Sequence, residues 1–164
     1  MPVHPAVAAK ELLPVPEPLP APVIDAHTHL DACGAETAED AAAAMARAAL
    51  VGVVAAVTVG GDAESNRWAV SAASQREDLF AAVAVHPTEA LTLDDAVRAE
   101  LEAQAADPHV VAVGETGLDN YWDFAPAAAQ EEAFAWHIDL AKRIGKPLMI
   151  HDRLAHERIF EILD

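Results

Sequence analysis

Histidine and glutamate, two residue types that bind metal ions, follow three separate apolar runs of this chain. His27 and His29 lie two residues apart in the segment IDAHTHLD, Glu115 follows a second apolar run, and His151 ends a third. Side chains two residues apart in a strand point to the same side, so His27 and His29 can bind one ion. Imidazole nitrogens together with a carboxylate are a typical ligand set for divalent metals. Together these segments predict a metal site, although an HxH motif alone is a weak signal.

Each of these residues also has a structural interpretation when its segment is taken alone. Glu115 is flanked by Gly114 and Gly117, which allow positive φ or close backbone approach, so a turn with a solvated glutamate is an equal alternative. His151 is compatible with a hydrogen-bonded structural histidine, and Arg153 with a surface charge. The occurrence of such side chains at three predicted strand ends favours a common site over coincidence.

Short apolar runs that are typical of buried strands recur along the chain at intervals of roughly 30 residues. They cover Val23–Ala26, Val53–Val59, Phe80–Val85, Val110–Gly114 and Leu148–His151. Helical segments lie between them, with predicted starts at Thr37, Asp62, Thr92 and Pro126 and predicted ends at Gly52 and Gly145. Repeated βα units of this length predict a parallel α/β fold with right-handed crossovers. Periodicity alone leaves two architectures open, a doubly wound open sheet and a closed barrel.

The composition is that of an ordinary globular domain, with 53% hydrophobic and 23% charged residues. A formal net charge of −17 argues against a protein that coats nucleic acid with a basic surface. A polyanionic substrate would require local positive charge, and a bound divalent cation is the natural source of it.

Residues 1–22 are rich in proline and contain no continuous apolar stretch, so we expect an extended arm rather than a signal peptide. Cys33 is the only cysteine, which excludes a disulfide within the chain and fits a reducing cytoplasm. The apolar segment 41–59 is divided by Gly52 into an alanine-rich half and a β-branched half. This pattern predicts a helix followed by a strand and no membrane span.

Four motifs of the sequence are similar to those of the TatD family of metal-dependent hydrolases. They read IDAHTHLD, AVHPTE, VGETGLDNY and PLMIHDR, stand in the family's order and spacing, and cover residues 23–164. The resemblance implies a TIM-like (β/α)₈ barrel, of which this chain would hold about the first five βα units after the extension 1–22. It also implies one or two divalent cations (Mg²⁺, Mn²⁺ or Zn²⁺) and a 3′-to-5′ exonuclease or related DNase activity.

The resemblance assigns expected roles by position. His27 and His29 would bind one ion, Glu115 would bridge to a second ion as the catalytic carboxylate, and His151 would bind that second ion. Two bridged ions would activate water for attack on phosphorus. Arg153 would contact a substrate phosphate, and Asp119 would orient a ligand or a water molecule from behind, with a surface ion pair and a structural hydrogen bond as the respective alternatives.

Other residues near these motifs receive more general expectations. His86, in the His-Pro pair, is expected to line the site and contact substrate without being a ligand. Tyr121, Trp122 and Phe124 either stack on a nucleobase or form a hydrophobic cluster that closes the barrel rim. The remaining histidines are expected to be solvated or satisfied in the core; they are His4, His109, His137 and His156.

The family's ligand set also contains a histidine after the sixth strand and an aspartate after the eighth, neither of which this chain includes. We therefore expect the N-terminal part of a barrel, with DNA, single-stranded or at its 3′ ends, as the substrate and possible self-association through the open barrel edge. Two rival functions remain. One is a related barrel hydrolase that acts on another ester or an amide, and the other is a non-catalytic α/β module whose histidines and glutamate need not converge.

Overall fold

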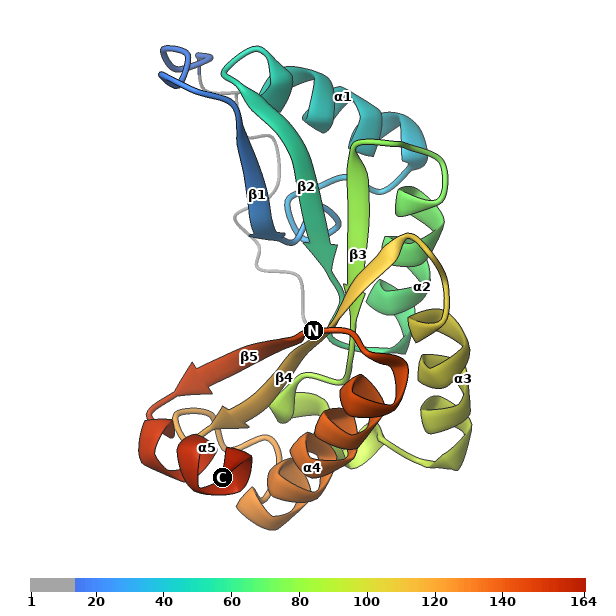
Figure 1. Cartoon of the computed structure of the whole chain (residues 1–164), viewed down its shortest axis with the longest axis vertical. Helices are drawn as coiled ribbons and strands as arrows, with labels where there is room; N and C mark the ends of the chain where they lie inside the picture. The colour runs from blue at the N-terminus through green and yellow to red at the C-terminus, as the bar shows by residue number, and fades with distance from the viewer. Residues whose placement is uncertain (1–13) are drawn as a thin grey trace.

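Five parallel strands form one sheet in which every strand pairs with the next strand of the chain. The computed structural model describes residues 14–164. The strands are β1 (Val23–Thr28), β2 (Val53–Val59), β3 (Leu79–Val83), β4 (Val110–Asp119) and β5 (Leu148–Arg153). A doubly wound sheet reverses its strand order at a switch point, whereas the order β1-β2-β3-β4-β5 has no reversal. The strands curl into a half-barrel (Figure 1), so the TIM-like architecture with five βα units is confirmed.

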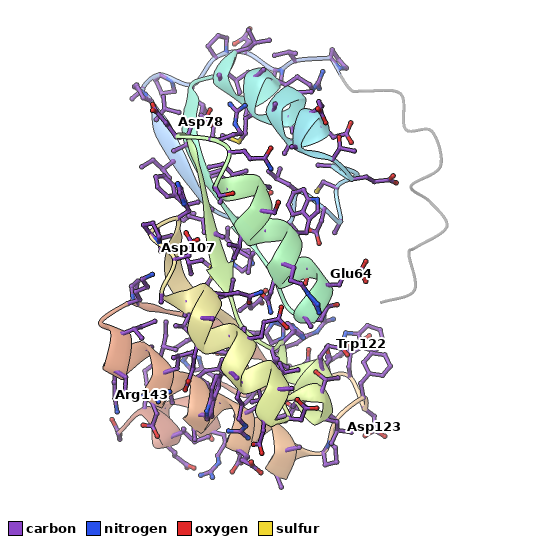
Figure 2. All side chains as sticks on the ribbon, turned by 90° about the vertical axis from the view of Figure 1, so that its right-hand side faces the viewer. Glu64, Asp78, Asp107, Trp122, Asp123 and Arg143 are labelled. Atoms are coloured by element: carbon purple, nitrogen blue, oxygen red, sulfur yellow. The ribbon has the colours of Figure 1, made fainter. Side chains whose placement is uncertain are left out.

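The helices cover one face of this curved sheet, as the two perpendicular views in Figures 1 and 2 show. They are α1 (Ala38–Ala49), α2 (Ala63–Ala73), the 3₁₀ helix η2 (Pro87–Thr92), α3 (Asp95–Ala105), α4 (Ala127–Ile144) and α5 (His156–Leu163). The largest core cluster lies between this layer and the sheet and includes Leu79, Val83, Leu101 and Val113. Burial of such side chains is the main favourable contribution to folding, about 1.5–3 kcal/mol for each large aliphatic group.

Two of the predicted helix starts are confirmed by complete capping boxes. Thr37 accepts from the Asp40 N–H, and Asp62 accepts from the Ser65 N–H. The predicted start at Thr92 is wrong, because η2 occupies the chain up to Thr92 and Asp94 caps α3 instead. An aspartate carboxylate is a strong N-cap acceptor, here 2.9 Å from the Val97 nitrogen.

The predicted helix ends are confirmed only in part. Gly145 ends α4 in the left-handed conformation, with φ of 69°. Gly52 lies beyond the end of α1, where Leu50 is the C-cap, and has φ of 95° in the turn to β2. Both glycines therefore supply backbone that other residues rarely adopt, although Gly52 does so outside the helix.

Strand ends differ from the predicted ones where the site is built. β3 ends at Val83 rather than Val85, and β4 continues from the predicted Gly114 to Asp119. The β3–β4 pairing stops at Val83↔Val113, and β4 then continues along β5 from Thr116↔Ile150 to Asp119↔Arg153. Glu115 therefore lies inside a strand, at the irregularity where β4 leaves one neighbour and continues along the other.

Part of the predicted N-terminal extension 1–22 can be compared with the structure. Residues 1–13, including His4, lie outside the described residues. Residues 14–22 form no helix, and the Leu19 N–H donates to the Val51 carbonyl at 2.8 Å. In the described part of the chain, no helix has the length and apolar character needed to cross a membrane.

The outer strands bear on the expected self-association. Within residues 14–164, β1 and β5 each pair with one strand only, and Ile24 and Ile150 on these strands are exposed. Such edges can pair with another chain. Self-association of the polypeptide 1–164 therefore stays a prediction.

Candidate metal centre

The Glu115 carboxylate lies between histidines that come from two distant strands. Its Oε2 atom is 3.2 Å from Nε2 of His27 and 3.6 Å from Nε2 of His29. Its Oε1 atom is 2.6 Å from Nδ1 of His151. The two Nε2 atoms of His27 and His29 are 3.2 Å apart, so the alternation expected for the HxH motif is present in space. The structure thus brings the four predicted metal-site residues together.

Two overlapping groups of potential ligands result from this arrangement. His27, His29 and Glu115 each offer one atom within 4.8 Å of the others, and so do His86, Glu115 and His151. Glu115 belongs to both groups. His86 lies closer to the centre than the sequence predicts, since its Nε2 atom is 3.1 Å from Nδ1 of His151.

The neighbours of each imidazole determine where its proton lies in the neutral form. Nδ1 of His29 faces the Val59 carbonyl at 2.8 Å and must donate to it, which leaves a lone pair on Nε2. Nε2 of His151 faces Oδ2 of Asp119 at 2.9 Å, so this nitrogen donates and Nδ1 keeps its lone pair. In the neutral rings both lone pairs point toward Glu115, as metal ligands with an outer hydrogen-bond partner commonly do. When either ring is protonated, the same nitrogen instead donates a hydrogen bond to the Glu115 carboxylate.

His86 has the opposite arrangement. Its Nδ1 atom accepts from the Thr88 N–H at 3.2 Å, so in the neutral ring Nε2 carries the proton. Burial, followed by the nearby charge of His151, lowers the pKa of His86 to about 4, so the ring is neutral near pH 7. His86 therefore presents a hydrogen-bond donor to the centre, and its lone pair is already used.

Glu115 and the histidines next to it shift one another's pKa values. Burial alone would raise the pKa of Glu115, but the hydrogen bonds of His151 and His29 hold it well below its usual range. The same Glu115 interaction raises the pKa of His29 and of His151. Glu115 is thus an anion at neutral pH, with a side chain only 14% exposed. An ionised, largely buried carboxylate surrounded by imidazoles is suited to bind a cation.

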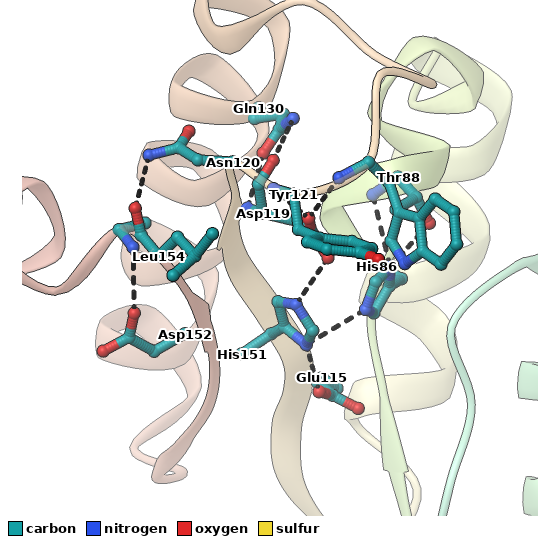
Figure 3. Close-up of polar contacts among 12 residues, drawn as sticks. His86, Thr88, Glu115, Asp119, Asn120, Tyr121, Gln130, His151, Asp152 and Leu154 are labelled. Atoms are coloured by element: carbon teal, nitrogen blue, oxygen red, sulfur yellow. Dashed lines mark hydrogen bonds and ion pairs between the residues drawn. The ribbon is translucent and has the colours of Figure 1, made fainter.

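Asp119 connects the centre to the loop that follows β4 (Figure 3). While Oδ2 faces His151, Oδ1 accepts from the N–H groups of Tyr121 and Trp122 at 2.8 and 2.9 Å. Behind it, the Gln130 side chain accepts from the Asp119 N–H and donates to the Asp119 carbonyl. Asp119 is 1% exposed, and its position is determined by hydrogen bonds at both ends.

Two glycines let β4 and β5 approach closely at Glu115. A Cβ atom on Gly114 would overlap the Met149 side chain, and one on Gly117 would overlap the His151 carbonyl. Gly117 also has φ of 143°, in the region that favours glycine. Both glycines therefore allow close backbone approach, and Gly117 also supplies a positive φ. Together they place Glu115 beside His151.

Buried polar side chains from the helices hold the strand ends that carry the site. Asn66 on α2 pairs with both backbone groups of Ala84, and Nε2 of His137 on α4 accepts from the Val85 N–H at 3.1 Å. These contacts replace the ladder that β3 lacks beyond Val83, directly before His86. Nδ1 of His137 also lies 3.1 Å from the Thr116 hydroxyl, next to Glu115.

No local sequence pattern identifies these supporting residues. A histidine or an asparagine inside a helix has the same local pattern whether it is exposed or bound to a distant strand. His137 was expected to be solvated or satisfied in the core, and it is fully buried and hydrogen-bonded.

We expect His137→Leu to destabilise the protein, because the Val85 N–H would then be buried without an acceptor. The cost of such an unpaired group is about 1–3 kcal/mol. Urea unfolding at pH 7 measures it, with the exposed His156→Gln variant as the control. A His137→Leu protein with unchanged free energy of unfolding would contradict the role of this hydrogen bond.

The same variant should change the pH dependence of stability. Burial lowers the pKa of His137 from 6.5 to about 4, whereas the unfolded chain binds this proton near pH 6.5. The stability contributed by the neutral ring is therefore present above pH 6.5 and lost as the pH falls toward 4. Between pH 7 and pH 5 the natural protein should lose about 2 kcal/mol more than His137→Leu. Identical pH profiles would mean that His137 is not held neutral by folding.

Arg153 does not point into the ligand groups. Its guanidinium lies over the Tyr121 ring, with Cζ 4.1 Å from the ring centroid. Neither a hydrogen bond nor an ion pair of this guanidinium occurs within residues 14–164, so the alternative of a surface ion pair has no partner there. His109 and His156, expected to lie outside the site, pair with Asp107 and Asp152.

Comparison with known proteins identifies relatives over nearly the whole described chain. The family model of TatD related DNase matches residues 24–164. The "uncharacterized metal-dependent hydrolase TatD" of Mycobacterium tuberculosis is 56% identical over 146 residues, which cover 86% of this chain and 55% of that protein. The "3′-5′ ssDNA/RNA exonuclease TatD" of Cronobacter turicensis is 37% identical over 120 residues, covering 73% of this chain and 46% of the relative.

A solved structure agrees with these relatives. The crystal structure of the TatD homologue YjjV from Escherichia coli superposes with a TM-score of 0.77 at 30% sequence identity. The match covers 85% of this chain and 54% of that one, so the chain spans about half the length of the relatives it matches. On the extent of the family match and the shared fold, the chain belongs to the TatD family of metal-dependent hydrolases.

Proposed function

We propose that the protein is a divalent-metal-dependent phosphodiesterase that removes nucleotides from the 3′ ends of single-stranded nucleic acid. The observation that carries this proposal is the position of Glu115, whose two carboxylate oxygens face different histidine groups. Oε2 faces His27 and His29, and Oε1 faces His151. A carboxylate shared in this way is suited to bridge two cations. The exonuclease name of the Cronobacter relative supports the choice of substrate.

The donor set fits divalent cations. In the neutral rings, His29 and His151 each direct a nitrogen lone pair toward the ionised Glu115 carboxylate. The Val59 carbonyl and Asp119 accept the hydrogen on the other nitrogen of each ring, which leaves the lone pair free for a metal ion. Such ions, when bound, lower the pKa of water and neutralise charge on phosphoryl oxygens. In a chain of net charge −17, they would also allow a polyanion to approach.

The proposed roles follow from these contacts. His27, His29, Glu115 and His151 would hold the metal, with Glu115 shared between the two histidine groups. Asp119 keeps the proton of His151 on Nε2 and thereby its lone pair on Nδ1. His86 donates its Nε2 hydrogen to a phosphoryl oxygen, because its other nitrogen is engaged with Thr88. Arg153 contacts a neighbouring phosphate of the strand.

Two rivals predict different observations. A non-catalytic α/β module does not require convergence of four ligand-type side chains from strands that are far apart in sequence, and the distances around Glu115 speak against it. A related barrel hydrolase for another ester or an amide would use the same metal ligands. Only a substrate test separates that rival from a nuclease.

The test is a metal-dependent assay with the protein stripped by a chelator. Single-stranded oligonucleotides labelled at the 5′ or the 3′ end are incubated with added Mg²⁺, Mn²⁺ or Zn²⁺, beside a carboxylic ester and an amide. We expect loss of activity on stripping, recovery with at least one ion, and shortening from the 3′ end. Hydrolysis that survives stripping, or turnover of the ester or amide without the oligonucleotide, would overturn the proposal.

A further inference from the structure

The loop that follows β4 exposes three aromatic side chains beside one another. Tyr121 is 55% exposed, Trp122 46% and Phe124 64%. The chain has only three Trp, one Tyr and four Phe, so this loop holds a large share of its aromatic surface. Figure 2 shows Trp122 and the neighbouring Asp123 at the outer edge of the molecule. Such exposed aromatic surface is a candidate binding site.

Three rings and one cation lie against one another in this region, here called the aromatic platform (Tyr121, Trp122, Phe124 and Arg153). The Trp122 and Phe124 rings are stacked, 5.5 Å apart at 13°, and Tyr121 meets Trp122 edge-on at 4.8 Å. The Arg153 Cζ atom lies 4.1 Å from the Tyr121 centroid and 5.7 Å from that of Trp122. The platform therefore combines aromatic faces with a positive charge.

The guanidinium of Arg153 differs from most others in this acidic chain in the kind of group it contacts. Five other arginines each have a carboxylate within 3.1 Å, namely Arg67, Arg76, Arg98, Arg143 and Arg158. Arg153 has no such partner in the part of the chain that the structure describes. An arginine held against aromatic rings without a carboxylate keeps its donors available for an anion such as phosphate.

Hydrogen bonds of Asp119 connect the platform to the candidate metal centre. Oδ1 of Asp119 accepts the N–H groups of Tyr121 and Trp122, and Oδ2 faces His151. Further along, the Asn120 N–H donates to the Arg153 carbonyl, and the Asn120 side chain donates to the Leu154 carbonyl. In Figure 3 Tyr121 lies beside His151. One carboxylate therefore holds both His151 and the backbone that carries the first two rings of the platform.

The exposure of the rings separates the two interpretations left open by the sequence. A cluster that closes the rim would bury its rings, whereas these rings pack on one another and remain about half exposed within residues 14–164. Stacking on an aromatic ring contributes about 1–3 kcal/mol per base and tolerates any base, because every base has a π face. A cation beside the rings matches a base that is attached to a phosphate.

We infer that the aromatic platform stacks a nucleobase of the bound strand, while Arg153 contacts the adjoining phosphate. This inference rests on the proposed function and specifies how that site would recognise its substrate. It commits to a base of a single-stranded nucleic acid; contact with a protein is the rival occupant.

The test compares oligonucleotides that carry or lack bases. The protein and its Trp122→Ala/Phe124→Ala variant are titrated with a 5′-fluorescein single strand, and with the same strand carrying abasic residues at its three 3′-terminal positions. Binding is followed by anisotropy and by Trp fluorescence. We expect the double variant to lose about 10-fold or more in affinity for the normal strand, as loss of one stacked base implies. For the abasic strand, the two proteins should bind alike.

Matched variants separate stacking from a change in folding. Trp122→Phe keeps an aromatic face and should retain most of the affinity, whereas Trp122→Leu keeps apolar bulk and should lose it. Phe160→Ala removes an exposed aromatic residue on α5 and should have no effect. Circular dichroism checks that each variant is folded.

Several outcomes would overturn the inference. One is equal loss of affinity for the normal and the abasic strand. Another is unchanged affinity accompanied by a changed molecular mass in light scattering, which would make the platform a protein contact. Binding is measured without turnover, so the inference is tested even if the protein hydrolyses no phosphodiester. Failure of hydrolysis with intact base-dependent binding would remove the proposed function and leave the platform as a binding site.

Discussion

Glu115→Gln is expected to lower kcat for phosphodiester hydrolysis by about 10²-fold or more, the size expected for a group that acts on the transition state. The substitution keeps the shape of the side chain but removes its charge. It also places an amide NH₂ against either His151 or the His27–His29 pair, where Oε1 and Oε2 now lie 2.6 and 3.2 Å from the nearest nitrogens. Both histidine groups would therefore lose the shared anion, and one of them would also lose its acceptor oxygen.

Binding of single-stranded DNA should change little in the same variant, because Arg153, His86 and the aromatic platform are left in place. Glu64→Gln, the same change at an exposed position on α2, serves as the control and should behave as the natural protein does. Turnover is measured under saturating oligonucleotide, with affinity measured separately by anisotropy. Unchanged turnover would remove Glu115 from the mechanism, and an equal loss of affinity and turnover would make its role one of substrate binding.

Asp119→Asn is expected to weaken metal binding about 10- to 100-fold, the usual cost of losing a residue that orients a metal-ligating histidine. The carboxylate now accepts the Nε2 hydrogen of His151 with Oδ2 and two loop N–H groups with Oδ1. An asparagine has one acceptor oxygen, so it cannot satisfy both sides. If the oxygen stays with the loop, the NH₂ group faces His151 and shifts its proton to Nδ1, the nitrogen that should bind metal.

Calorimetric titration of the stripped protein with Mn²⁺ or Zn²⁺ measures this effect directly. Asp139→Asn, an exposed position on α4, is the matched control. Activity of Asp119→Asn should recover in part when the ion concentration is raised, because the defect lies in the retention of the metal. A variant with unchanged metal affinity would reduce Asp119 to a structural support of the loop.

Much of the framework is encoded in local sequence. The five apolar runs correspond to the five strands, and Thr37 and Asp62 begin helices because a hydroxyl or carboxylate at the N-cap accepts the same N–H group in any context. The spacing of two residues between His27, in β1, and His29, just beyond its end, brings their Nε2 atoms within 3.2 Å, as the two-residue period of extended backbone predicts. The motifs IDAHTHLD, AVHPTE, VGETGLDNY and PLMIHDR together were enough to indicate the TatD family, and the family match confirms it.

The exact ends of strands required the tertiary structure. β4 extends past Gly114 because β5 continues beside it, and β3 stops at Val83 because side chains of α2 and α4 take over its backbone hydrogen bonds. Those partners are distant in sequence, so no local pattern records them. Strand order is likewise a property of pairing: an open doubly wound sheet and a half-barrel share the same βα periodicity, and only the observed order separates them.

The inner arrangement of the site was also decided by folding. Nε2 of His86 and Nδ1 of His151 lie 3.1 Å apart across 65 residues of chain, and only then does His86 become a hydrogen-bond donor to the centre. Asp119 was expected either to orient a ligand or a water molecule or to make a structural hydrogen bond, and in the structure it contacts both His151 and two loop N–H groups. No local pattern indicated that His137 would bind the backbone of β3 beyond Val83. The sequence determines which groups are present and on which side of a strand they lie, whereas proton positions and ligand distances depend on neighbours that only the folded chain supplies.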